Sequence, residues 1–307
     1  MGTMVKTVTG ALPLAQLGYC QMHEHLYVSL GPATRENPAL LIDQIDKSSL
    51  EAARYFAAGG RSLLDAQPGG AGRDARALRA ISLASDLAIL CVTGFHLPMF
   101  YPAGHPIDTM DEGALYALFL SELLEGVSED KAICAGAVKA ALTSDGFSGR
   151  TKDKLRAAAR AAKAADVPLV IHTERGAGAL QAIDACMRLG LPPWRILICH
   201  ADRQAADFAP HEAIARTGAL LEYDTIGRFK YHSDEDEVRL IVHMLEKGFE
   251  AQLLLSLDTT AARLTSYGGA IGLDYLLTSF LPRLRAQNIP ESVLRTITLV
   301  NPTRAFA

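Results

Sequence analysis

An alternation of short apolar runs with longer amphipathic stretches constrains the fold of this 307-residue chain more than any other feature. The runs are rich in β-forming residues, whereas the stretches between them contain Ala, Leu and spaced charges, which is typical of helices. Eight runs recur, at residues 18–23, 61–65, 88–93, 132–139, 168–172, 196–200, 219–223 and 253–258.

Three of the stretches predict helices with clear ends. Residues 151–165 are Ala-rich and stop before Pro168, and residues 178–189 and 235–247 each end near a glycine. Strands that alternate with helices imply parallel strands joined by right-handed crossovers. Eight such units predict an α/β fold, a single (β/α)8 TIM barrel domain over residues 1–307. The alternative is a doubly wound open sheet, but that fold usually has a Gly-rich phosphate loop after its first strand, and none follows residues 18–23.

The charge of the chain bears on its binding partners, and its cysteine content bears on its redox environment. The chain has 30 Lys and Arg against 34 Asp and Glu, a net charge of −4, which argues against general binding of nucleic acid or anionic membrane. It has no apolar stretch of membrane-spanning length and no N-terminal signal pattern. We expect a cytoplasmic protein with a small-molecule substrate. The sequence leaves undecided whether the protein forms a homodimer. Its five cysteines, without a C-x-x-C motif, are expected to be reduced: Cys20, Cys91, Cys134, Cys186 and Cys199.

Ligand-capable side chains gather at the carboxyl ends of five of the eight runs. In a barrel these ends meet at one mouth, where active sites lie. Four histidines, one lysine and one aspartate suit two divalent cations, with zinc as the first choice. The residues are His23, His25, Lys139, His172, His200 and Asp258.

The first two of these histidines are two residues apart. Residues i and i+2 of a strand point to the same side, so His23 and His25 can both face the barrel axis and bind one cation. The motif is not the H-E-x-x-H of helical zinc proteases, because Tyr27 stands where that motif needs histidine. H-x-H alone also fits a pair of surface residues.

Each remaining candidate has a structural alternative. Lys139 ends an apolar run, so it either reaches solvent or reacts with CO2 to give a carbamate that bridges two cations. His172 and His200 could be hydrogen-bonded core residues, and Asp258 could cap a helix that starts at residue 259. The occurrence of all of them at five strand ends favours the metal site.

Together these motifs resemble the binuclear branch of the amidohydrolase superfamily, and within it the phosphotriesterase-related proteins. M-H-E-H at 22–25, G-G-A-G-R-D at 69–74, T-G-F-H at 93–96 and N-P-T-R-A-F at 301–306 carry the resemblance.

The resemblance implies a role for each ligand. His23, His25 and Asp258 would hold the more buried cation, and His172 and His200 the more exposed one. A carboxylated Lys139 and a hydroxide would bridge them. The resemblance also implies a metal-dependent hydrolase of ester bonds in which the hydroxide attacks and Asp258 is the catalytic proton acceptor. No G-x-S-x-G motif argues for a serine nucleophile instead.

The segment after the seventh run bears on the substrate. Arg228, Lys230 and Tyr231 form a G-R-x-K-Y segment that looks like one in relatives that hydrolyse phosphorylated sugar lactones. We therefore predict that these three residues bind substrate, the arginine through two parallel hydrogen bonds to an anion. The alternative is a solvated loop. The chain departs from those relatives after Asp258, where Arg263 and Tyr267 stand at shifted positions.

A Pro- and aromatic-rich loop after the third run could also line the pocket through His96, Tyr101 and His105. Opening of a lactone is the preferred function. The alternatives are hydrolysis of a phosphotriester or an amide by the same centre, or a barrel that only binds a ligand.

Overall fold

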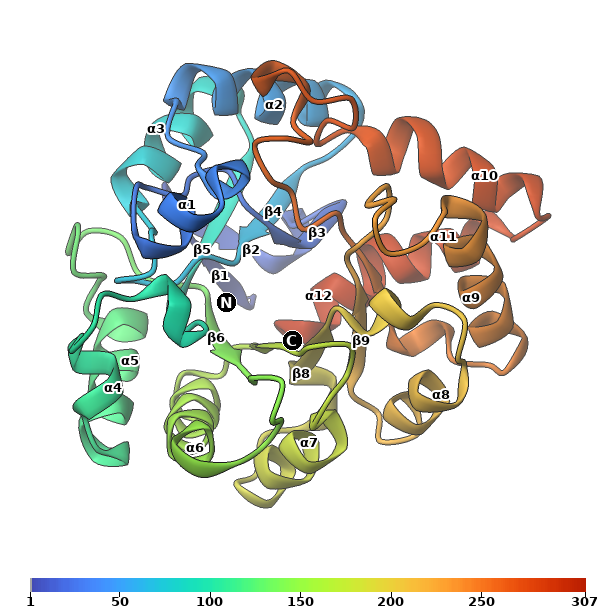
Figure 1. Ribbon diagram of the computed structural model, residues 1–307. Coiled ribbons are helices and arrows are strands. Elements are labelled where there is room, and N and C mark those ends of the chain that lie inside the picture. Colours follow the sequence, from blue (N-terminus) through green and yellow to red (C-terminus); the bar gives the residue numbers. More distant parts are fainter. Residues whose placement is uncertain (1) are drawn as a thin grey trace.

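A computed structural model describes residues 2–307 and shows a ring of parallel strands surrounded by helices (Figure 1). Eight strands follow one another around the ring in chain order, which confirms the predicted barrel. They are β3 (Cys20–Glu24), β4 (Ser62–Asp65), β5 (Ala88–Gly94), β6 (Ala137–Ala141), β7 (Leu169–His172), β8 (Ile196–Cys199), β9 (Leu220–Tyr223) and β10 (Leu253–Leu255).

Helices connect the strands on the outside of the ring. The longer ones are α2 (Ile45–Ala57), α3 (Ala75–Ser85), α5 (Glu112–Leu124), α6 (Gly149–Ala165), α7 (Ala179–Arg188), α8 (Ala209–Ala215), α9 (Asp234–Glu246) and α10 (Leu281–Ala286). The shorter ones are α1 (Pro32–Glu36), α4 (Pro106–Thr109), α11 (Glu291–Arg295) and α12 (Asn301–Ala305). Helices α6, α7 and α9 begin and end close to the predicted boundaries.

Two strand boundaries differ from the sequence prediction by three residues or more. Strand β6 begins at Ala137 instead of residue 132, because the preceding segment makes loop hydrogen bonds such as Ala135 N–H to Glu122 O. Strand β10 ends at Leu255, so Asp258 lies in the loop that follows the strand.

The ring is nearly closed, and the seam between β10 and β3 lies beside the predicted site. No β10–β3 strand ladder is present within residues 2–307. Instead, Asp258 N–H donates to His23 O at 3.2 Å and His23 N–H donates to Ser256 Oγ at 3.1 Å. The pairing of β3 with β4 shifts register between Gln21 and Glu24. Irregular backbone therefore carries ligands from both sides of the seam.

The amino-terminal end of the barrel is filled by apolar side chains. Met22, Leu90 and Leu254 belong to a buried interior cluster. Val5 of the hairpin β1 (Met4–Thr7) and β2 (Gly10–Pro13) and Phe306 after α12 join the same cluster. The polar side chains of the interior consequently gather at the opposite, carboxyl end.

The G-G-A-G-R-D motif serves the scaffold. Arg73 is buried and its guanidinium bonds Glu122 at 2.9 Å, Glu129 at 2.7 Å and Val92 O at 2.6 Å. The carboxylate of Asp74 accepts from the first turn of α3 as its N-cap. The motif thus joins β5, α3 and α5 without entering the site.

The five cysteines form no disulfide within residues 2–307. None of the helices in this part of the chain combines the length and apolar character that crossing a bilayer requires.

Acid stability should depend on His211, a buried residue of α8 that is not among the predicted metal ligands. Its Nδ1 is 3.0 Å from Tyr223 Oη, and burial lowers the pKa of His211 to about 4. The unfolded chain, with a pKa of about 6.5, binds the proton more readily, so acidification below 6.5 favours unfolding. Between pH 6.5 and pH 5 the free energy of unfolding should fall in both proteins. We expect the fall to be about 2 kcal/mol smaller in His211→Gln than in the wild type. Urea titrations at both pH values measure this, and equal losses in the two proteins would contradict it.

Candidate metal centre

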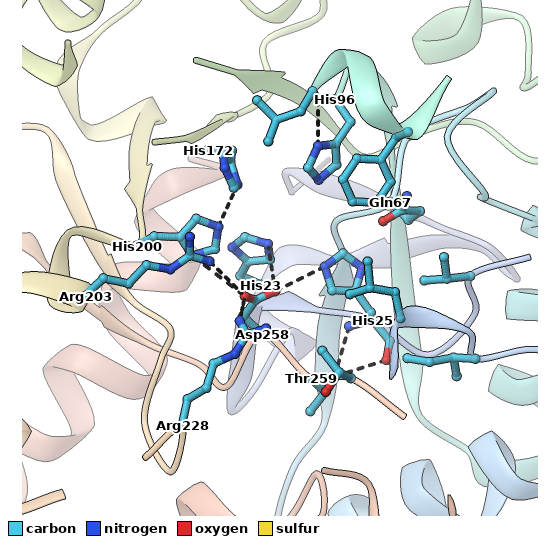
Figure 2. A pocket seen from close by; sticks show the side chains of 16 residues that line it. His23, His25, Gln67, His96, His172, His200, Arg203, Arg228, Asp258 and Thr259 are labelled. Carbon is cyan, nitrogen blue, oxygen red and sulfur yellow. Dashed lines mark hydrogen bonds and ion pairs between the residues drawn. The ribbon is translucent and has the colours of Figure 1, made fainter. Parts of the chain in front are cut away.

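Side chains from both sides of the seam converge at the carboxyl end of the barrel (Figure 2). His25 Nε2 lies 3.3 Å and His23 Nε2 lies 3.8 Å from the same atom, Asp258 Oδ1. Within this group of three residues, one ligand atom from each lies within 4.8 Å of the others. His23 and His25 both line the cavity, as their i, i+2 spacing predicts.

His172 and His200 form the second part of the cluster. His172 ends β7 and His200 follows β8, and His200 Nε2 lies 2.8 Å from His172 Nδ1. The ring centroids of His200 and His23 are 4.9 Å apart, so this pair adjoins the first group. Two imidazoles with their nitrogens this close can share one cation.

Lys139 forms the floor of the site. Its side chain points inward from β6 and is 0% exposed, which excludes the interpretation that it reaches solvent. Its Nζ lies 3.1 Å from His23 Nε2, and it forms no ion pair with a carboxylate within residues 2–307. A buried amine without an anion beside two groups of imidazoles fits a carbamate that bridges two cations.

Burial keeps three of the histidines neutral. It lowers the pKa of His23 to about 4, with the charge of Lys139 adding to the effect, and lowers those of His172 and His200 to about 3. At neutral pH these imidazoles therefore carry no proton on one nitrogen, which is the form that binds metal ions.

Asp224, directly after β9, orients two of these histidines. Its Oδ2 accepts from His23 Nδ1 at 2.8 Å and its Oδ1 accepts from His200 Nδ1 at 2.6 Å. Burial opposes its charge, but His200 and His23 lower the pKa of Asp224 well below the usual value. Both histidines consequently present Nε2 to the site. Asp224 was not among the predicted site residues, although it directly follows the seventh run, as ligand candidates do at other strand ends.

Two of the predicted ligands have strained backbones. His200 has φ 63° and Asp258 has φ 48°, a region that non-glycine residues rarely adopt. Such conformations persist where surrounding structure enforces them, and they often occur at functional sites. No helix starts after Asp258, since Thr259 instead donates through Oγ1 to Glu24 at 2.9 Å. The alternative of Asp258 as a helix cap is therefore wrong.

The second carboxylate oxygen of Asp258 faces two arginines (Figure 2). Arg228 donates to Oδ2, and Arg203 Nη2 lies 3.4 Å from the same atom. Burial alone would raise the pKa of Asp258, but Arg228 and the neighbouring histidines hold it well below its usual range. Asp258 is therefore an anion with Oδ1 toward the histidines and Oδ2 toward the cavity mouth.

A cavity of about 110 Å³ opens above these groups. Arg203 and Arg228 form its charged side, and His96 faces it from the loop after β5. Of the other loop candidates, Tyr101 and His105 are not part of its lining. The apolar wall consists of Val28, Leu40, Ile42, Leu97 and Phe100.

The predicted substrate-binding residues divide into two groups. Arg228 lines the cavity, whereas Lys230 and Tyr231 do not. Lys230 is exposed, with Nζ 4.7 Å from the centre of the Tyr231 ring. The same ring packs against the guanidinium groups of Arg203 at 4.9 Å and Arg228 at 5.6 Å. Tyr231 thus packs against the two arginines without lining the cavity itself. Arg203, three residues after His200, was not among the predicted site residues.

Comparison with known families assigns this chain to one of them. The family model described as the phosphotriesterase family matches residues 3–306. The chain belongs to the phosphotriesterase family. Proteins of this family use a divalent metal centre, and the His23, His25 and Asp258 group is a candidate for part of it.

Named relatives in the phosphotriesterase family agree with this assignment. The chain is 28% identical to a phospho-furanose lactonase of Mycoplasmopsis synoviae over 98% of this chain and 91% of that protein. The crystal structure of a lactonase from Listeria monocytogenes matches with a TM-score of 0.92 and 26% identity over 99% of both chains. An N-acetyltaurine hydrolase of Salmo salar is 25% identical over 98% of this chain and 97% of that protein. This member of the phosphotriesterase family is a hydrolase that acts on ester bonds.

Proposed function

We propose that the chain is a lactonase with two divalent cations, zinc as the first choice. His23, His25 and Asp258 would hold one cation, His172 and His200 the other, and carboxylated Lys139 would bridge them. The observation that carries the proposal is the buried, unpaired Lys139 beside these neutral imidazoles. Such a ligand set of nitrogen and oxygen donors suits zinc.

When bound, the cations would supply a nucleophilic water at neutral pH and polarise the carbonyl oxygen of the lactone. Asp258 would accept the proton of that water at its carboxylate and pass it to the ring oxygen as the C–O bond breaks. The product is a hydroxy acid. Asp224 keeps His23 and His200 in the required tautomer. Leu97 and Phe100, in the apolar wall, would keep bulk water from the reacting carbon.

The charged side of the cavity favours a lactone with an anionic substituent. Arg203 and Arg228 are the guanidinium groups that line it, and a planar guanidinium suits phosphate. Arg263, at the shifted position, instead donates to Asp258 O at 3.1 Å and Ile226 O at 2.6 Å. Tyr267 Oη bonds Ser48 Oγ at 3.0 Å. A phosphorylated sugar lactone, the substrate class named for the Mycoplasmopsis synoviae relative, therefore fits through Arg228 and Arg203.

A substrate panel with metal removal tests the proposed function. The zinc-loaded protein is assayed with neutral lactones, phosphorylated lactones, a phosphotriester and an N-acyl amide. We expect fastest turnover of a phosphorylated lactone, loss of activity in a chelator and recovery when zinc returns. Full activity of the metal-free protein would overturn the metal mechanism. Inactivity of the zinc-loaded protein on every substrate would support a barrel that only binds a ligand.

Arg228→Met should separate substrate recognition from chemistry. Charged hydrogen bonds to an anion contribute about 1.5–3 kcal/mol, so KM for a phosphorylated lactone should rise roughly 10- to 100-fold more than KM for its unphosphorylated counterpart. The change in kcat, which includes the lost contact with Asp258, should be similar for the two. Arg239→Met on the exposed face of α9 is the control. Equal changes in KM for both substrates would argue against an anion site at Arg228.

Amide hydrolysis is the second candidate function. The N-acetyltaurine hydrolase relative is named for an amide whose leaving group bears a sulfonate, and the same two arginines suit that anion. Faster turnover of N-acetyltaurine than of any lactone in the panel would favour this candidate.

A further inference from the structure

A second cluster of metal-ligand side chains lies outside the cavity. Asp202 belongs to the short helical turn η5 (Ala201–Gln204), His232 to the loop between β9 and α9, and Glu237 to α9. One ligand atom from each lies within 4.8 Å of the others. None of the three lines the cavity described above. The cluster joins three segments that are separate in the sequence.

The two carboxylates of this cluster are buried, and most of their oxygens accept no hydrogen bond. Asp202 and Glu237 are both 0% exposed. Asp202 Oδ2 accepts from Thr225 N at 2.6 Å and Oγ1 at 2.7 Å, but its Oδ1 has no partner, and neither oxygen of Glu237 accepts a hydrogen bond. Within residues 2–307, neither carboxylate forms an ion pair with Lys or Arg. Burying two such groups is costly unless something positive stands between them.

His232 presents a nitrogen lone pair to the same place. Its Nδ1 lies 3.1 Å from Ser233 O and donates there, which leaves Nε2 without a proton. Nε2 lies 3.1 Å from Glu237 Oε2 and 3.0 Å from Thr225 Oγ1. The single proton of the Thr225 hydroxyl goes to Asp202, so Nε2 faces oxygen lone pairs on both sides. A cation would satisfy all of these atoms at once.

We propose that Asp202, His232 and Glu237 bind a further divalent cation, separate from the two of the catalytic centre. Two carboxylates with one imidazole combine hard and borderline ligands, which suits Mn²⁺ or Zn²⁺. The ion would fasten η5 and α9 to the loop that carries Arg228. It would therefore have a structural role and hold one side of the cavity in place.

The test uses Mn²⁺ as the probe and does not require activity. We expect an anomalous-difference peak between Asp202, His232 and Glu237 in crystals of the full chain with Mn²⁺. Glu237→Gln should lose one bound ion per chain by elemental analysis and should lose part of the rise in Tm that Mn²⁺ produces. His232→Gln, in a loop, tests the same site if the helix variant folds poorly. Glu246→Gln, exposed on the same helix, is the matched control and should lose no ion.

A variant with a disabled catalytic centre, His23→Asn with His25→Asn, separates this inference from the proposed function. It should keep the Mn²⁺ peak at Glu237. In the wild type, a peak at Glu237 with none at His200 or Lys139 would support the further site and contradict the proposed centre. If Mn²⁺ occupies only the catalytic centre, and Glu237→Gln binds as many ions as the wild type, the further site is overturned and the buried carboxyls hold protons instead.

Discussion

Lys139→Met should reduce hydrolysis by roughly 1,000-fold or more. Losing the proposed bridging ligand would remove most of the electrostatic stabilisation that two cations would supply, and about 4 kcal/mol corresponds to this factor. Met keeps the length and apolar stem of the buried side chain, so the barrel should fold. We expect elemental analysis to find fewer than two cations per chain in the catalytic centre, and steady-state assays to show the loss in kcat.

The carbamate itself has a direct signature. ¹³C-labelled bicarbonate should give a carbamate carbon signal in the wild type that is absent in Lys139→Met. Lys247→Met, at the exposed end of α9, is the control and should keep both activity and signal. An active Lys139→Met protein with a full complement of cations would remove Lys139 from the proposed centre.

Asp258→Asn should lower kcat by about 10²- to 10⁴-fold, the usual contribution of a positioned proton acceptor. The amide can still offer one oxygen at the Oδ1 position, but it cannot take a proton at neutral pH. We expect this variant to retain more bound cation than Lys139→Met, which distinguishes lost proton transfer from lost metal. Its rate should depend on the leaving group more steeply than that of the wild type, because the alkoxide departs without help.

Asp184→Asn, exposed on α7, is the matched control for this substitution. If Asp258→Asn keeps wild-type kcat at full metal loading, then another group moves the proton.

The barrel could be predicted because its signals are local and repeated. The runs at 168–172 and 196–200 match β7 and β8 to within one residue, and the helical stretches at 151–165 and 235–247 match α6 and α9 to within two. Because the carboxyl ends of barrel strands meet at one mouth, six polar side chains were predicted to lie together there. The structure brings all six together. That they bind cations stays a prediction.

The site features that the sequence did not predict depend on contacts between segments that are distant in the chain. Asp224 acquires its place only because β9 lies between β8 and β10, which brings it to His200 and to His23 across the ring. Arg203 reaches Asp258 from a turn whose direction follows from the unusual backbone of His200. Lys230 looked equivalent to Arg228 in sequence, but its ammonium lies over the Tyr231 ring in the exposed part of the loop.

Asp224 does not line the cavity, but it connects the two proposed cation positions through His23 and His200. Because the two oxygens of Asp224 accept from different imidazoles, loss of this carboxylate would free the tautomers of His23 and His200 together. One buried carboxylate thus sets the ring orientation of a ligand at each of the two proposed cation positions.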